Sequence, residues 1–151
     1  MTNDPSRKQN GLMLVESLMA VAIFSFGILA LISMQAAAIK QAGDAKLRAD
    51  ASYLTGQIIS QMWVDRSNLV NYAHNTDGSD CVFTGGTTTS TNLSNWLGNA
   101  TKKGTLIGTL PNATSQILVE TGTNKVTVTV CWRGPQETTT HNFTSTALIS
   151  G

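Results

Sequence analysis

Few residues in this 151-residue chain are of the types that carry out chemistry, and their spacing limits what they can do. The two histidines are His74 and His141, and the two cysteines, Cys81 and Cys131, lie 50 positions apart. The sequence has no Cys-x-x-Cys pair, and the motifs Gly-x-Ser-x-Gly, His-Glu-x-x-His and Gly-x-Gly-x-x-Gly and the P-loop are also missing. Zinc sites, nucleophilic triads and nucleotide-binding loops therefore lack their usual patterns. We expect no catalytic activity, no metal and no cofactor.

The composition favours an exported domain. Charged residues make up 13% of the chain, about half the usual share, and Thr, Ser, Asn and Gly supply the polarity instead. If the domain lies outside the cytoplasm, Cys81 and Cys131 are expected to form a disulfide, which would contribute ~4 kcal/mol in the chain-entropy model. The net charge is +1, which gives no steering toward nucleic acid, so we expect no nucleic-acid partner.

Glu16 is the acidic residue at the start of a strongly apolar stretch. The 23 residues that follow it, Ser17–Ile39, contain no charge and no proline. As a helix they extend roughly 34 Å, which is enough to cross a hydrocarbon layer of ~30 Å. A carboxylate near the core of a membrane segment costs ~2.5–3.5 kcal/mol by insertion scales, so it usually has a partner and a function. The alternative is that Glu16 reaches the headgroups from the end of the helix.

The apolar stretch has three interpretations. A secretory signal peptide would be cut near Ala36-Ala37-Ala38 and leave a chain that starts at Ile39, but signal peptides have apolar regions of ~7–15 residues, shorter than this one. A plain signal anchor fits the length and gives Glu16 no role. The third interpretation is a leader that is cut just before the apolar stretch. Positive charges flank the stretch on both sides, so the positive-inside rule does not decide its orientation.

The third interpretation comes from a resemblance. The string Gly11-Leu12-Met13-Leu14-Val15-Glu16 resembles the class III signal of type IV prepilins and pseudopilins. In that family a membrane peptidase cuts after the glycine and methylates the new amino terminus, which implies cleavage between Gly11 and Leu12 and N-methylation of Leu12. The family's glutamate is the fifth residue of the mature chain, as Glu16 would be. Leu12 stands where phenylalanine is usual, and Met13 where threonine is.

The resemblance also implies a role for Glu16 in subunit assembly, and this role has a physical basis. Cleavage after Gly11 exposes an ammonium group at Leu12. When such helices pack with an axial stagger, the carboxylate of Glu16 lies near the amino terminus of a neighbouring subunit. In a low dielectric that pairing offsets the desolvation of both charges.

The apolar pattern continues beyond the membrane segment and predicts a helix to about Arg66. Apolar residues recur there at spacings of three and four, which is typical of a helix packed on a domain. The predicted stripe consists of Leu47, Ala51, Leu54, Ile58 and Met62, widened by Ile59 and Trp63. Turn-forming residues between Ser67 and Gly78 end this helix.

The carboxyl-terminal part reads as a small antiparallel sheet. Residues 78–112 are loop-rich, with a short helix at 92–97, and strands are predicted at 116–120, 125–133 and 138–146. The strand at 125–133 alternates strictly, with one face formed by Val126, Val128, Val130 and Trp132. This face is expected to pack against the long helix. Cys131 falls on the opposite face, so its bridge is expected to tether the loop region.

These elements predict an α+β fold, a long amino-terminal helix packed on a small antiparallel sheet, which the resemblance identifies as the type IV pilin fold. The expected divisions are a leader at 1–11, a membrane and assembly helix at 12–39, an exposed half of the long helix at 40–72, and a globular region at 73–151. The carboxyl-terminal part, around Leu110-Pro111 and the strand at 125–133, is similar to PilV-type minor pilins.

The resemblance implies a minor pilin that initiates or modifies a type IV pilus and so affects adhesion or motility. Its expected partners are other major and minor pilins and the prepilin peptidase. It would be a single-pass protein of the inner membrane with a periplasmic carboxyl-terminal domain before it enters the extracellular fibre. A pseudopilin of a type II secretion system, and a membrane-anchored or secreted binding domain, are the alternatives.

Overall fold

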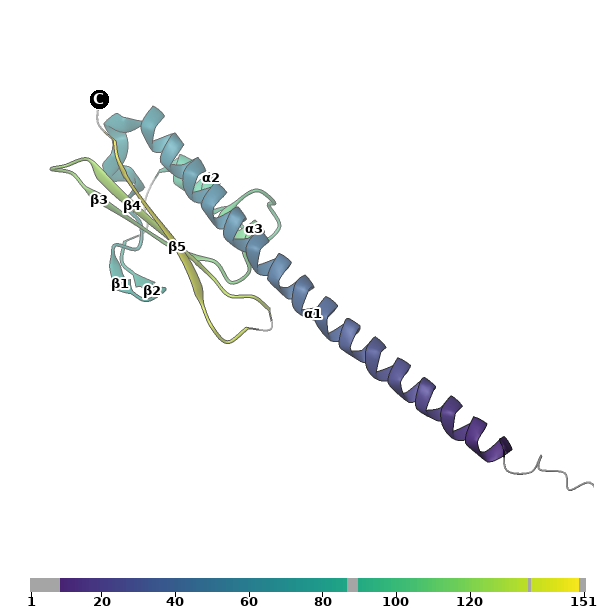
Figure 1. Cartoon of the computed structure of the whole chain (residues 1–151). Coiled ribbons are helices and arrows are strands. Elements are labelled where there is room, and N and C mark those ends of the chain that lie inside the picture. The colour runs from purple at the N-terminus through teal and green to yellow at the C-terminus, as the bar shows by residue number, and fades with distance from the viewer. Residues whose placement is uncertain (1–8, 87–89, 136, 150–151) are drawn as a thin grey trace, which may run out of the picture. The chain divides into compact units, whose positions relative to one another are not determined.

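The computed structural model describes residues 9–86, 90–135 and 137–149. The chain divides into two compact units, Met1–Asp44 and Ala45–Gly151. A long, apolar amino-terminal helix and a small antiparallel sheet give an α+β fold, as predicted (Figure 1). Most of the predicted leader, residues 1–8, lies outside the described residues.

The long helix α1 runs from Gln9 to Val64. It begins inside the predicted leader and ends close to the predicted end. The helix ends there because Asp65 has a non-helical backbone, and Arg66–Tyr72 forms a separate 3-10 helix, η1. The carboxylate of Asp65 accepts hydrogen bonds from Asn68 Nδ2 at 2.7 Å and Tyr72 Oη at 3.0 Å, and such local bonds compete with helix continuation.

The second unit holds the hydrophobic core. The turns of α1 in this unit bury Ala51, Leu54, Ile58 and Met62, as the apolar stripe predicts. Leu47 and Ile59 lie half-buried at the border of the core. The prediction for Trp63 is wrong, since 44% of this residue is exposed: it lies about 100° around the helix from Met62 and falls outside the buried stripe.

Three antiparallel strands form the main sheet, in the order β3-β4-β5. They are β3 at Thr114–Glu120, β4 at Lys125–Trp132 and β5 at His141–Leu148. All three strands were predicted, although the last begins three residues later and ends two residues later than expected. The inward face of β4 is buried in one cluster with the α1 stripe, which confirms the predicted packing of helix and sheet; this face consists of Val126, Val128, Val130 and Trp132.

The segment between α1 and the sheet has more regular structure than predicted. A hairpin pairs β1, Asp77–Ser79, with β2, Val82–Thr84. The helix α2, Thr91–Leu97, agrees with the predicted short helix and is capped by the Ser90 hydroxyl. A single helical turn, α3, covers Leu106–Thr109.

Polar contacts join α2 to α1 and to η1. The indole N–H of Trp96 in α2 donates to the backbone oxygen of Leu54 at 2.8 Å, and both residues are buried. Tyr72 in η1 is fully buried, donates to Asp65, and accepts from Asn92 Nδ2 at 2.9 Å. Burial is the main cause that raises the pKa of Tyr72, so its hydroxyl keeps the proton that it donates.

We expect Tyr72→Phe to lower the free energy of unfolding by about 1–3 kcal/mol, because it leaves the groups that now bond to this buried hydroxyl without their partner. Tyr53→Phe is the matched control, since Tyr53 is 69% exposed and its hydroxyl should contribute little. Denaturant titration of the full chain in detergent, followed by tryptophan fluorescence, measures both. All three tryptophans lie in the second unit. Equal midpoints for the two variants would contradict the prediction.

Candidate functional site

The predicted cleavage and assembly residues lie on the exposed first part of α1. Gly11, Leu12 and Glu16 are all helical, and every residue from 11 to 43 is exposed. Leu12 and Glu16 are four positions apart, so they occupy the same face of the helix one turn apart. Within the described residues, Glu16 has no ion-pair partner.

The amino-terminal part of α1 has the length and composition of a membrane span. Its most apolar window has a mean hydropathy of 2.3, and none of that window is buried within the chain. Such a helix fits either a membrane span or a signal anchor. The exposed apolar side chains, among them Leu12 at 75% and Phe26 at 72%, form far more apolar surface than a water-exposed helix usually carries.

Serine hydroxyls in this part of α1 are satisfied within the helix. Ser17 donates to the carbonyl oxygen of Met13 at 2.9 Å, and Ser25 to that of Val21 at 2.7 Å. Ser33 makes the same contact one turn back. Such i to i−4 bonds allow a hydroxyl to enter an apolar environment without an unpaired donor. Glu16 is the ionisable side chain of this segment that has no ion-pair partner among residues 9–86, 90–135 and 137–149.

The predicted disulfide is present. The Sγ atoms of Cys81 and Cys131 are 2.01 Å apart, and the bridge joins the turn of the β1–β2 hairpin to β4. Asp80 and Cys81 both have positive φ, at 52° and 67°, which is the backbone of a tight two-residue hairpin turn. The predicted tether of the loop region is thus confirmed. Cys131 lies on the face opposite the core and is itself fully buried.

The Gln116 side chain adds a second attachment for the hairpin. Its Nε2 donates to the carbonyl oxygen of Asn75 at 2.9 Å and lies 3.3 Å from those of Asp77 and Gly78. The hairpin is thus held by a covalent bond and by a buried amide, with little apolar contact of its own.

The two histidines do not form a shared site. His74 is buried beside Ile117 of β3, where the two residues exchange backbone hydrogen bonds at 3.0 and 2.9 Å. His141 lies 2.9 Å from Glu137 Oε2 and stacks on Trp132, with ring centroids 5.8 Å apart. The contacts of His74 and of His141 thus belong to two separate parts of the domain.

His74 is expected to make the fold less stable in mild acid. Burial lowers the pKa of His74 below its ordinary value of 6.5, so the unfolded chain takes up this proton at a higher pH than the folded chain. The stabilisation from neutral His74 is complete above about pH 6.5 and decreases as the pH falls toward the lowered pKa. Unfolding midpoints of the full chain between pH 7.5 and pH 5 measure this loss of stability, because histidine titrates within that pH range.

His74→Gln should remove this part of the pH dependence. His141→Gln is the matched control, because it changes the other histidine and leaves the burial of His74 intact. An equally steep loss of stability in His74→Gln and in the unmodified chain would contradict the assignment.

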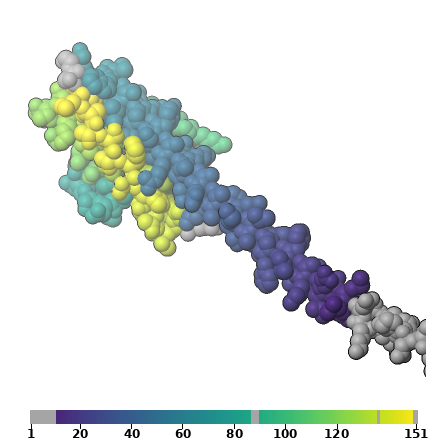
Figure 2. Space-filling view, in the orientation of Figure 1, coloured from purple at the N-terminus to yellow at the C-terminus, as the bar shows by residue number. Residues whose placement is uncertain are grey.

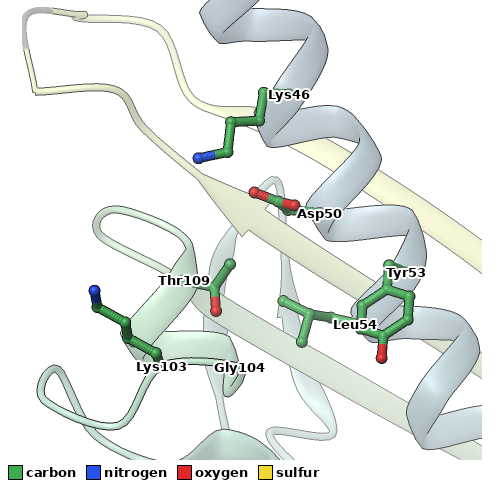
Figure 3. A pocket seen from close by; sticks show the side chains of 8 residues that line it. Lys46, Asp50, Tyr53, Leu54, Lys103, Gly104 and Thr109 are labelled. Atoms are coloured by element: carbon green, nitrogen blue, oxygen red, sulfur yellow. The ribbon is translucent and has the colours of Figure 1, made fainter.

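A groove of about 450 Å³ lies in the second unit between α1 and the 103–109 segment (Figure 3). Lys46 and Asp50 project into it from successive turns of α1, opposite Thr109. Its walls are formed by Lys46, Asp50, Tyr53, Leu54, Lys103, Gly104, Gly108 and Thr109. This lining includes no histidine or cysteine. Across the described residues, no group of three or more His, Cys, Asp and Glu side chains is placed to hold a metal ion.

No protein-family model matches the chain, and searches of curated proteins and of solved structures find no match.

Proposed function

We propose that the chain is a minor subunit of a type IV pilus. In this proposal it is made with a leader, trimmed between Gly11 and Leu12, N-methylated at Leu12, and held in the inner membrane by residues 12–39 until it enters the fibre. The observation that carries the proposal is the position of Glu16. It is an acid on an exposed apolar helix, without an ion-pair partner in the described part of the chain, one turn after the residue that would become the amino terminus.

The energetics of that acid support assembly with other helices. A carboxylate in the apolar part of a membrane is unfavourable unless a positive group neutralises it. An ammonium at Leu12 of an adjacent, axially staggered subunit supplies that charge. The same subunit then offers its own Glu16 to the next amino terminus, so the contact repeats along a fibre.

The second unit supports the proposal in a coarser way. An α+β domain whose small antiparallel sheet packs on the continuation of the long helix is the layout expected of a pilin. The disulfide between Cys81 and Cys131 is typical of compartments outside the cytoplasm, and this agrees with a periplasmic domain. In the fibre, the proposed partners are major and minor pilins.

Mass spectrometry of the chain isolated from cells with an active prepilin peptidase tests the proposal. We expect the mature protein to begin at Leu12 and to carry one methyl group on its amino terminus. A chain that begins at Ile39 indicates a signal peptide, and one that begins at Met1 indicates a simple anchor; either result overturns the proposal.

Gly11→Val should block trimming and leave residues 1–11 in place. A side chain at Gly11 meets no atom within 4 Å, so the substitution should not disturb the fold. A failure to cut would therefore report a loss of recognition by the peptidase. Gly27→Val is the matched control on the same helix, where a side chain also meets no atom within 4 Å. Normal cleavage of Gly11→Val would contradict the assignment of the cleavage site.

A further inference from the structure

The outer edge of β5 is an uncovered sheet edge of full strand length. All eight residues of β5 pair with β4 without interruption, from Lys125↔Leu148 to Trp132↔His141. In the part of the chain that the structure describes, β4 is the strand that pairs with β5, and no strand pairs with the opposite edge of β5. Figure 2 shows the strand, in yellow, uncovered along its length. Alternate residues of such a strand direct their backbone N–H and C=O groups outward.

The other edge of the sheet is covered by the chain itself. Beyond β3, His74 exchanges two backbone hydrogen bonds with Ile117. The Asn75 side chain donates to the carbonyl oxygen of Ser115 at 3.0 Å, and the Gln116 side chain holds the start of β1 against the same edge. The fold therefore covers the β3 edge and leaves the β5 edge open.

The β5 edge lacks the features by which sheet edges usually avoid association. Such features are charged side chains, proline, bulges and short strands. Residues 142–148 contain no charged residue and no proline, and the register with β4 has no bulge. His141, at the end of the strand, is the one titratable residue in it and is engaged with Glu137.

The side chains on the two faces of β5 indicate which side chains a further strand beside it would need. On the outer face, the hydroxyl of Thr144 lies 3.1 Å from that of Thr129, and the hydroxyl of Thr146 lies 3.3 Å from that of Thr127. On the inner face, Phe143 and Ala147 are half-buried against the core. A strand added beside β5 would extend both faces if hydroxyl-bearing and apolar residues alternate along it.

We propose that β5 accepts an extended segment of another protein by strand addition. That segment is uncharged in its centre and alternates hydroxyl-bearing with apolar residues. Backbone hydrogen bonds provide the affinity and the alternating side chains provide the specificity. The inference is independent of the proposed function, because it depends only on the sheet of the second unit.

A peptide copy of β4 is the probe, because β4 is the strand that pairs with β5 along its other edge. It comprises residues 125–133 with serine in place of Cys131. The control peptide carries proline at two consecutive central positions, which removes a donor from each of its edges. Both are titrated into the full chain in detergent micelles, with binding followed by fluorescence anisotropy and by hydrogen exchange of the backbone amides.

In the free chain we expect alternate amides of β5 to exchange fast and the others slowly. The β4 peptide should slow the fast set and bind at least about tenfold more tightly than the proline peptide. Ser145→Lys places a charge on the inner face of the edge and should weaken binding about tenfold or more. Ser145→Thr, the matched control, should keep it. Because the exchange measurement uses the unmodified chain, the test holds even if Ser145→Lys perturbs the fold.

Three results would overturn the proposal. The first is slow exchange of every β5 amide in the free chain at all concentrations, which means that the edge is already covered. The second is protection that increases with the concentration of the chain alone, which means that the occupant is a second copy. The third is equal binding of the two peptides, which means that edge hydrogen bonds do not contribute.

Discussion

Glu16→Ala is expected to leave the chain inserted in the membrane and trimmed after Gly11, but to exclude it from the pilus. Insertion depends on the apolar residues that follow Glu16, and removal of an acid makes a membrane segment more favourable. In the proposed function, assembly depends on the pairing between Glu16 and the ammonium of a neighbouring Leu12. Without the carboxylate, that ammonium would have to enter the bundle of helices unpaired.

The expected decrease in assembly is large because the substitution removes one member of the ion pair and leaves the other. Removal of one member of a buried ion pair typically costs ~3–5 kcal/mol, since the remaining charge stays desolvated without compensation. This corresponds to a decrease of more than about a hundredfold in the assembly equilibrium. Glu16→Gln should behave almost as badly, because an amide keeps the shape and loses the charge. Glu16→Asp keeps the charge on a shorter side chain and should retain part of the incorporation.

Immunoblots of fibres sheared from cells, with the membrane fraction as reference, measure the ratio of assembled to inserted protein. Ser25→Ala is the matched control on the same helix, because the Ser25 hydroxyl donates to the carbonyl oxygen of Val21 in its own helix. We expect that variant to be incorporated normally. If Glu16→Ala reaches the fibre as efficiently as the unmodified chain, the pairing role of this acid is wrong.

The features that could be predicted from the sequence are those in which side-chain periodicity decides the structure. The stripe from Ala51 to Met62 and the alternation from Val126 to Trp132 bury apolar area at the periods of a helix and a strand, and the structure places both in one core. The short helix at Thr91–Leu97 also follows from local chemistry, since the Ser90 hydroxyl caps its amino end and Gly98, with φ of 61°, ends it.

The features that were missed depend on contacts between residues far apart in the chain. The β1–β2 hairpin is exposed and has no apolar alternation; the bridge to Cys131 and the amide of Gln116 hold it in place. The burial of His74 depends on its pairing with Ile117 of β3. The open edge of β5 depends on the strand order, which local patterns do not specify.

The candidate assembly site was predicted from the resemblance of residues 11–16 to a prepilin signal and from one acid in an unusual place. A carboxylate at the start of an uncharged apolar helix is expensive enough to require an explanation even without any neighbouring residue. The structure adds that Leu12 and Glu16 share one face and that both are exposed. In the proposed function, the partner that completes this site belongs to another chain, so the sequence and fold of one subunit do not include it.

Loss of the disulfide is expected to cause the largest loss of stability in the second unit. The bridge between Cys81 and Cys131 spans 50 positions, and closing a loop of that length contributes ~4 kcal/mol in the chain-entropy model. Small domains have a total stability of ~5–15 kcal/mol, so the reduced chain should lie close to its unfolding threshold. The hairpin should also detach from the sheet, because the bridge is its main attachment.

Cys81→Ser and Cys131→Ala both remove the bridge, and the difference between them isolates the effect of burial. Cys81 is half-buried in the hairpin turn and its replacement leaves Cys131 as a buried free thiol, whereas Cys131→Ala removes a fully buried side chain. Each variant should unfold at a much lower denaturant concentration than the oxidised chain, and Cys131→Ala at the lower of the two because it also leaves a small cavity. The unmodified chain treated with a thiol reductant provides the reference without any substitution and should match Cys81→Ser. Reduction that leaves the unfolding midpoint unchanged would mean that the Gln116 amide and the sheet hold the hairpin by themselves, and that the bridge stabilises neither.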